Sequence, residues 1–302
     1  MPRAVGRFAP SPTGPLHLGS LVAAVGSWLF ARARAGRWLV RMEDLDTPRV
    51  VPGAADEILR ALERYGLTRD GEVVFQSRRY EAYEEALRIL RRKEVLFPCA
   101  CSRADLARAA SAPDPADAAP PGVYPGTCRA GLPGGKEARS FRFRVPAGLF
   151  TFEDIVFGSL SEDVSAVVGD FVVKRADGPY AYQLAVVVDD AAEGVTEVVR
   201  GADLLDSTGR QIALQRALGV PTPRYAHLPL VLGPDGAKLG KRFGALPLAT
   251  LSEKQVQETL SLALRILGQD PADGTATEIL EEAQRRFDPR AIPRGPHRVG
   301  ET

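Results

Sequence analysis

Apolar positions in the first 45 residues follow two different spacings, and the change between them marks the first elements. Residues 3–9 (RAVGRFA) predict a short buried strand, and the turn-rich segment PSPTGP follows it. From residue 16 to about residue 35, apolar side chains recur every three or four positions, which predicts a helix that Gly36 ends. Residues 38–42 (WLVRM) predict the next strand. Strand, helix and strand in this order form a βαβ unit, so we expect a parallel sheet.

The same patterns predict elements along the rest of the chain. Helices are expected over residues 54–65, 80–93, 206–218, 253–267 and 276–286. The apolar runs 184–188 and 195–199 predict two more buried strands, and weak alternation over 140–175 predicts short antiparallel strands. Segment 111–122 (SAPDPADAAPPG) has the composition of a loop or a disordered stretch.

This order of elements indicates one α/β domain that is divided by an insertion. The two halves of the domain are expected at residues 1–79 and 176–235, with the insertion at residues 80–175. Residues 236–302 are then expected to hold a basic loop, a short helical part and a flexible tail rich in arginine and proline.

Composition and charge narrow the classes of protein. With 302 residues, of which 45% are hydrophobic and 25% charged, the chain cannot be collagen-like, wholly disordered or a disulfide scaffold. No apolar run approaches the roughly 18 residues of a membrane span, and the first residues lack a signal-like apolar core, so we expect a cytoplasmic protein without a membrane partner. Lys+Arg number 39 and Asp+Glu 38, so contact with nucleic acid requires a local basic patch.

The segment HLGS at residues 17–20 lies where the first predicted loop enters the first predicted helix. Free backbone N–H groups and the positive end of the helix dipole make this place suitable for an anion. Gly19 allows a base or a phosphate to approach the backbone, and His17 could donate a hydrogen bond to a phosphoryl oxygen. The alternative is a helix-capping loop with an incidental histidine.

A second candidate for phosphate chemistry is the segment GAKLGKR at residues 236–242. Lys238 and Lys241 would form a cationic loop that closes on a triphosphate and stabilises charge at the α-phosphorus. The glycine spacing does not fit a Walker A motif, and the first helix lacks the Gly-x-Gly-x-x-Gly of a dinucleotide site. The alternative is a solvated basic turn.

Together, the His-x-Gly and Lys-x-x-Lys segments resemble the two signature motifs of class I aminoacyl-tRNA synthetases. Longer runs within residues 3–245 resemble the glutamyl-tRNA synthetase family: RFAPSPTGPLHLGSL, LVRMEDLDTPR, YAYQLAVVVDD, VTEVVRGADLL and YAHLPLVLGPDGAKLGKR. The resemblance implies a ligase with a Rossmann-type parallel sheet, helices on both faces, and a zinc-containing α+β insertion that contacts RNA. It assigns catalysis to His17, Gly19, Lys238 and Lys241, of which all but Lys238 would contact ATP.

A site for glutamate needs two cationic groups for its carboxylates and one carboxylate for its ammonium group. Arg7, Arg200 and Glu43 supply this set, and all three lie at predicted strand ends, where open α/β sheets bind ligands. The resemblance extends the predicted glutamate site to Phe8, Ala9, Pro10, Ser11 and Tyr182. The alternative is that each arginine is an ordinary surface residue.

Three cysteines, Cys99, Cys101 and Cys128, fall within 30 positions. Three thiolates can bind zinc, which prefers four tetrahedral ligands; the alternative is three free buried thiols. By resemblance to a short branch of the family, Tyr124 would be the fourth ligand, and Asp105 or a water molecule are the alternatives. The zinc would be structural and would stabilise the insertion.

The segment after Lys241 is too short for the anticodon-binding domain of long family members, so no such domain is expected. This feature resembles the short branch, which consists of the catalytic core alone. The resemblance implies that a monomer uses ATP with Mg²⁺ to convert L-glutamate to glutamyl-adenylate, without tRNA. The glutamyl group would then pass to the queuosine base of tRNA(Asp). The sequence departs from the family at Gly240, where a serine is usual, and at Arg242.

Three other functions can be compared with this one, and two of them remain open. A truncated synthetase could charge the 3′ end of tRNA(Glu), and a non-catalytic relative, favoured only by Gly240, could bind tRNA. A nucleotidyltransferase acting on a small cofactor would need no amino-acid pocket, so the set of Arg7, Glu43 and Arg200 argues against it.

Overall fold

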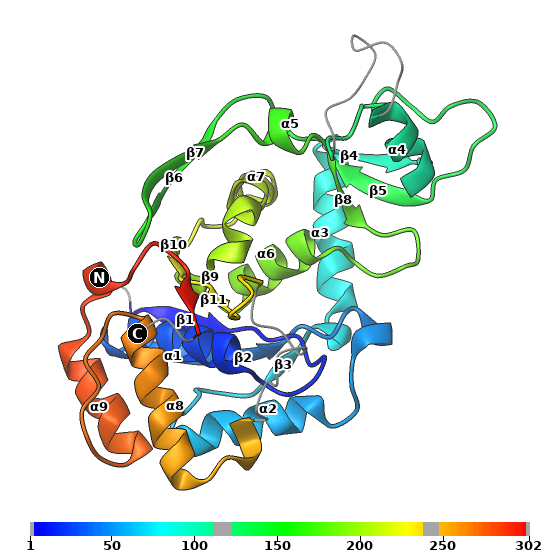
Figure 1. Ribbon diagram of the computed structural model, residues 1–302. Helices are drawn as coiled ribbons and strands as arrows, with labels where there is room; N and C mark the ends of the chain where they lie inside the picture. The colour runs from blue at the N-terminus through cyan, green and yellow to red at the C-terminus, as the bar shows by residue number, and fades with distance from the viewer. Residues whose placement is uncertain (1–2, 111–121, 238–247, 300–302) are drawn as a thin grey trace.

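The computed structural model describes residues 3–110, 122–237 and 248–299, and a mostly parallel sheet lies at its centre (Figure 1). One part of the sheet has the order β1-β2-β3, and the other has the order β7-β6-β10-β9. The strands are β1 Val5–Phe8, β2 Arg37–Met42, β3 Val74–Phe75, β6 Phe150–Asp154, β7 Gly158–Glu162, β9 Glu197–Gly201 and β10 Arg224–Leu228. β1 and β2 pair in parallel, as the βαβ pattern predicts.

The two parts of the sheet meet where β9 begins. Thr196 donates its backbone N–H to the carbonyl of Val5, and its hydroxyl accepts the N–H of Val5. β9 therefore lies beside β1, and the carboxyl ends of β1, β2, β9 and β10 reach the same edge. This is the edge at which open α/β sheets bind ligands, at the point where the strand order reverses.

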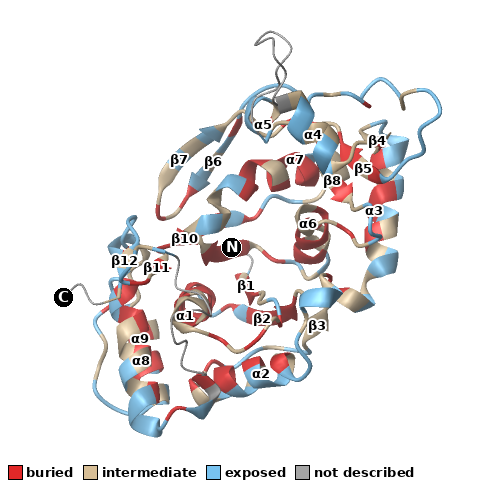
Figure 2. Ribbon diagram, turned by 45° about the vertical axis from the view of Figure 1, so that its right-hand side comes forward, coloured by how far each residue is buried: buried red, intermediate tan, exposed pale blue. Residues whose placement is uncertain are grey.

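Helices cover both faces of the sheet, and each face has its own apolar core. α1 Leu18–Arg32, α2 Ala54–Arg64, α8 Glu253–Ile266 and α9 Ala276–Arg286 contribute to one core, and α3 Tyr80–Arg92, α6 Tyr182–Ala192 and α7 Thr208–Leu218 contribute to the other. Neighbouring residues of one strand belong to opposite cores, as Val198 and Val199 of β9 do. This alternation follows from the period of two in a strand, and buried residues line both faces in Figure 2.

A small antiparallel sheet lies at the far end of α3 (Figure 1). Its strands are β4 Leu96–Cys99, β5 Ser140–Phe143 and β8 Phe171–Lys174, in that order, and the short helices α4 Arg103–Ala110 and α5 Val164–Val167 accompany it. The antiparallel strands expected within 140–175 are therefore present. β6 departs from this pattern because it also pairs in parallel with β10, between Asp154 and Tyr225.

The expected strand at residues 184–188 is wrong, because this run forms the middle of α6. Leu184, Ala185, Val186 and Val187 are all buried, so this part of the helix is covered around its circumference. A short, fully apolar run has no period that separates a buried helix from a buried strand, and β-branched residues favour the strand by propensity. α6 packs against both α3 and α7, and these contacts make the run helical.

The expectation of a flexible arginine-rich tail is also wrong for residues 287–299. The segment β12 His297–Arg298 pairs in parallel with β11 Val231–Leu232, and Ile292 is buried. The short 3₁₀ helices are Thr47–Arg49, Gln76–Arg78, Ala202–Ser207, Leu248–Thr250 and Pro289–Ala291. The predicted loop at 111–122 falls outside the described residues except for Gly122. None of the helices in the described ranges is long and apolar enough to cross a membrane.

Candidate active site

Two adjoining cavities open at the carboxyl edge of the sheet. The larger has a volume of about 670 Å³ and the smaller about 330 Å³. Both are lined by Phe8, Ser11, Ala23, Glu43, Gly201 and Leu204. Shared walls make the two cavities parts of one site, large enough for a nucleotide beside a small molecule.

The smaller cavity contains most of the residues that the sequence predicts for glutamate. Arg7, Phe8, Ala9, Ser11, Glu43, Tyr182 and Arg200 line it, and Pro10 lines the larger cavity. Residues from β1, β2, α6 and β9 thus converge although they are far apart in the chain. The two arginines and the glutamate lie in one pocket. This agrees with their predicted positions at strand ends, because the carboxyl ends of parallel strands meet at one edge of the sheet.

Arg7 is held by an acidic residue behind the pocket. Its Nε lies 3.0 Å from Oδ1 of Asp190, and its side chain also donates to the carbonyl of Val199 at 3.2 Å. The same Asp190 oxygen accepts from Arg41 at 2.7 Å, and Arg41 also pairs with Glu193. Asp190 therefore fixes two arginines at once, and Arg7 and Arg41 together hold its pKa below the ordinary value despite burial.

Arg41 and Glu193 are two residues of this network that the sequence analysis missed. Arg41 is fully buried in β2, and the available signal was a single charge inside the apolar run WLVRM. Oε1 of Glu43 lies 3.8 Å from Arg41 and has no hydrogen-bond partner among the described residues. Burial raises the pKa of Glu43 to about 7, although the charges of Arg41 and Arg7 lower it. A cationic ligand group would satisfy this carboxylate.

Three side chains hold Arg200, which also lines the smaller cavity. Its guanidinium group donates to Nε2 of His227 at 3.0 Å, to Oε1 of Gln211 at 2.7 Å and to Oγ1 of Thr208 at 2.9 Å. Nδ1 of His227 lies in turn 2.6 Å from Oδ2 of Asp154. Burial and the charge of Arg200 lower the pKa of His227 despite Asp154, so the imidazole is neutral.

His17 lies in the larger cavity at the beginning of α1. It is the N-cap residue, and its Nδ1 accepts the backbone N–H of Ser20 at 3.3 Å. A Cβ atom at Gly19 would lie 3.2 Å from the imidazole ring, so glycine gives this ring its space. Nδ1 of His17 therefore caps the helix, as the alternative predicted, and the residue also lines the larger cavity.

The structure does not test the lysine loop, because Lys238, Gly240 and Lys241 lie outside the described residues. Val231, at the beginning of β11 and a few residues before this loop in the sequence, lines the larger cavity. The roles of His17, Gly19 and the two lysines in catalysis stay predictions.

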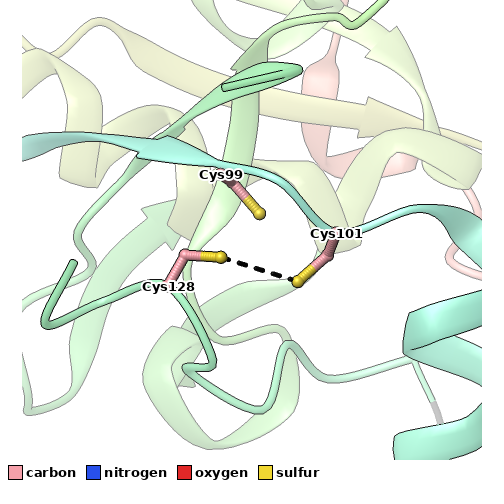
Figure 3. A group of neighbouring side chains, drawn as sticks. All are labelled: Cys99, Cys101 and Cys128. Carbon is pink, nitrogen blue, oxygen red and sulfur yellow. Dashed lines mark hydrogen bonds between the residues drawn. The ribbon is translucent and has the colours of Figure 1, made fainter. Parts of the chain in front are cut away.

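The three cysteines gather in the insertion, as their spacing predicts (Figure 3). Their sulfur atoms all lie within 4.8 Å of one another, and the sulfurs of Cys101 and Cys128 are 3.7 Å apart. Ligands on a tetrahedral zinc ion with Zn–S bonds of about 2.3 Å would be separated by about 3.8 Å, so this spacing fits a metal site. It is too long for a disulfide.

Tyr124 lies beside the three sulfurs. Its hydroxyl lies 3.6 Å from Sγ of Cys99 and accepts the N–H of Cys128 at 2.8 Å. Asp105, the alternative ligand, instead bonds reciprocally with Ser102 at the start of α4. The three thiols therefore fit a metal site, and Tyr124 as its fourth ligand stays a prediction.

A buried arginine lies beside this cluster. Nε of Arg142 donates to Sγ of Cys99 at 3.3 Å, and the guanidinium carbon lies 3.9 Å from the centre of the Tyr124 ring. Burial raises the pKa of Cys99, but hydrogen bonds from Tyr124, the Cys101 amide and Arg142 prevail and lower it to about 7. This environment favours the thiolate that a metal requires.

Comparison with known proteins gives consistent relatives. The family model for the catalytic domain of class I tRNA synthetases (E and Q) matches residues 4–292. A curated protein from Geobacter sulfurreducens called "Glutamyl-Q tRNA(Asp) synthetase" is 58% identical over 97% of this chain and 94% of its own length. One of the same name from Aromatoleum aromaticum is 54% identical over 93% and 86%.

A solved structure has the same fold over nearly the whole chain. It is a glutamate tRNA ligase from Elizabethkingia meningosepticum in complex with its amino acid, and it is similar with a TM-score of 0.81 at 27% identity. The match covers 99% of this chain and 67% of that protein.

Proposed function

Because the chain belongs to the glutamyl-Q tRNA(Asp) synthetases within the class I tRNA synthetase family, and is therefore a ligase, we propose that it activates L-glutamate with ATP and transfers the glutamyl group to the queuosine base of tRNA(Asp). The observation that carries this proposal is the smaller cavity, with two arginines and one glutamate on its walls, adjoining the cleft that contains His17.

The charges of this pocket complement those of glutamate. Arg7 and Arg200 are matched to the two carboxylates, and Glu43 to the ammonium group. Asp190 and the three side chains around Arg200 hold both guanidinium groups before the ligand arrives. Such preorganisation reduces the entropic cost of binding and disfavours the uncharged amide of glutamine.

In the first step, an oxygen of the glutamate α-carboxylate attacks the α-phosphorus of ATP. A bond forms between them, the bond to the bridging oxygen of the β-phosphate breaks, and pyrophosphate leaves. His17 at the positive end of α1, together with Lys238 and Lys241, would stabilise the charge that develops on the phosphoryl oxygens. Mg²⁺ would accompany the triphosphate of ATP and neutralise part of its charge.

In the second step, a hydroxyl of the queuosine base attacks the activated carbonyl carbon. An ester bond forms, AMP leaves, and the hydroxyl proton is released. Zinc, when bound by Cys99, Cys101, Cys128 and Tyr124, would cross-link the segments on either side of α4 and so stabilise the insertion. We assign the insertion, residues 80–175, to contact with the RNA that carries this base.

Two assays test the proposed function. Glutamate should drive exchange of pyrophosphate into ATP without any tRNA, because activation precedes RNA binding. Labelled glutamate should then become attached to queuosine-containing tRNA(Asp), through an alkali-labile ester, and not to queuosine-lacking tRNA(Asp).

Each rival function has its own outcome in these assays. Label on tRNA(Glu) would identify a truncated synthetase that charges the 3′ end, and absence of pyrophosphate exchange would identify a non-catalytic relative. Either result would overturn the proposal.

A further inference from the structure

We propose that Asp154 and His227 are a positioning pair that orients Arg200 in the glutamate pocket and thereby sets the preference for an acidic amino acid. Neither residue lines the smaller cavity, so the pair acts through Arg200. This inference rests on the proposed function, since it explains how the pocket recognises one substrate carboxylate.

The proton arrangement follows from the contact between Arg200 and His227. Nε of Arg200 always carries a proton and always donates, so Nε2 of His227, 3.0 Å away, must offer its lone pair. A neutral imidazole then carries its proton on Nδ1. That nitrogen lies 2.6 Å from Oδ2 of Asp154, a carboxylate that can only accept. Asp154 therefore selects the tautomer that Arg200 needs.

The backbone around β6 fixes Asp154 itself. Its Oδ1 accepts the N–H groups of Val156 at 3.0 Å, Phe157 at 2.9 Å and His227 at 3.3 Å. These bonds help to keep the pKa of Asp154 below its ordinary value despite burial. Asp154 is 3% exposed and His227 is fully buried, so water cannot substitute for either partner.

The remaining bonds of Arg200 define which of its protons face the substrate. Its side chain has five N–H groups, of which three donate to His227, Gln211 and Thr208. One N–H remains on each terminal nitrogen, and Arg200 lines the pocket. A carboxylate has an acceptor oxygen for each of these N–H groups, whereas an amide offers only one acceptor oxygen.

Asp154→Asn is the first test variant. Because Oδ1 faces three backbone donors, the asparagine oxygen should take that place and turn its NH₂ group toward Nδ1 of His227. The proton of the imidazole must then move to Nε2, where it faces the N–H of Arg200. We expect the ratio of kcat/KM for glutamate over glutamine in pyrophosphate exchange to fall about ten- to hundredfold. Asp163→Asn, at the N-cap of α5 and outside both cavities, is the control and should leave the ratio unchanged.

A matched pair of variants at His227 separates positioning from stability. His227→Gln places an amide near Nε2 and can still accept from Arg200, whereas His227→Asn places it near Nδ1 and can only serve Asp154. Each variant gives up one buried hydrogen bond, so their stabilities should be similar. Discrimination should be retained better in His227→Gln. Equal discrimination in the two variants would overturn the proposal.

Nuclear magnetic resonance of the unaltered protein gives a readout that does not depend on any variant. The chain contains three histidines, so the ring ¹⁵N signals of His227 can be assigned by elimination. We expect a neutral ring protonated on Nδ1; protonation on Nε2 would overturn the pair. Absence of glutamate-driven exchange in the unaltered protein would instead overturn the proposed function. Normal exchange with unchanged discrimination in Asp154→Asn would overturn only the positioning pair.

Discussion

Glutamate binding should weaken as the pH falls through 7, because the carboxylate proposed to hold the substrate ammonium group titrates there. Burial raises the pKa of Glu43 to about 7 in the ligand-free protein. Only the ionised carboxylate can pair with an ammonium group. At about pH 6 roughly one Glu43 in ten is ionised, so the apparent dissociation constant should be about tenfold its value at about pH 8, or about 1.4 kcal/mol.

Isothermal titration of glutamate across this range measures the effect directly, without the chemical steps of the reaction. The pKa values of both substrate carboxylates lie well below about 6, so these groups stay ionised throughout. Glu43→Gln is the control: it should bind more weakly than the unaltered protein near pH 8, with little dependence on pH. His17 is present in both proteins, so any contribution from its imidazole appears in both curves. A constant affinity in the unaltered protein, or the same pH dependence in Glu43→Gln, would refute the reasoning.

Three further predictions concern other parts of the molecule. Lys241→Ala should slow pyrophosphate exchange by about 10²–10³-fold with little change in glutamate affinity, because its charge acts in the transition state; a change confined to glutamate KM would contradict this. Arg142→Met should weaken the retention of zinc against a chelator by about tenfold, whereas the exposed Arg139→Met should not. Equal retention of zinc by the two variants would show that Arg142 does not act on Cys99. Gly26→Ala should lower the free energy of unfolding in urea by about 1–3 kcal/mol, because its Cβ would lie 2.5 Å from Leu228, whereas Gly134→Ala meets no neighbour and is the control.

Regular periods made most of the fold predictable from the sequence. The helix at the first βα turn, the parallel pairing of β1 with β2 and the two C-terminal helices all follow from strong apolar spacing. α6 was not predictable in this way, since its apolar run is continuous and its helical state depends on α3 and α7. The pairing of β12 with β11 was not predictable either, because a strand of two residues is too short to show a periodic pattern.

The substrate-facing residues were easier to predict than the residues that support them. Arg7, Glu43 and Arg200 stand at strand ends, and the topology brings strand ends together. Arg41 and the Asp154–His227 pair act across elements that the sequence places far apart, so no local spacing connects them. A lone charge or histidine inside an apolar strand is the only sign of such a partner.

The junction of β1 with β9 has a consequence for the making of this protein. Val5 leaves the ribosome well before its partner Thr196, which lies 191 positions later in the chain. At synthesis rates of about 5–20 residues per second, the edge of β1 waits on the order of ten to forty seconds before its neighbour exists. During that interval an apolar strand with unpaired backbone groups is exposed to other nascent chains, and chaperones can bind it.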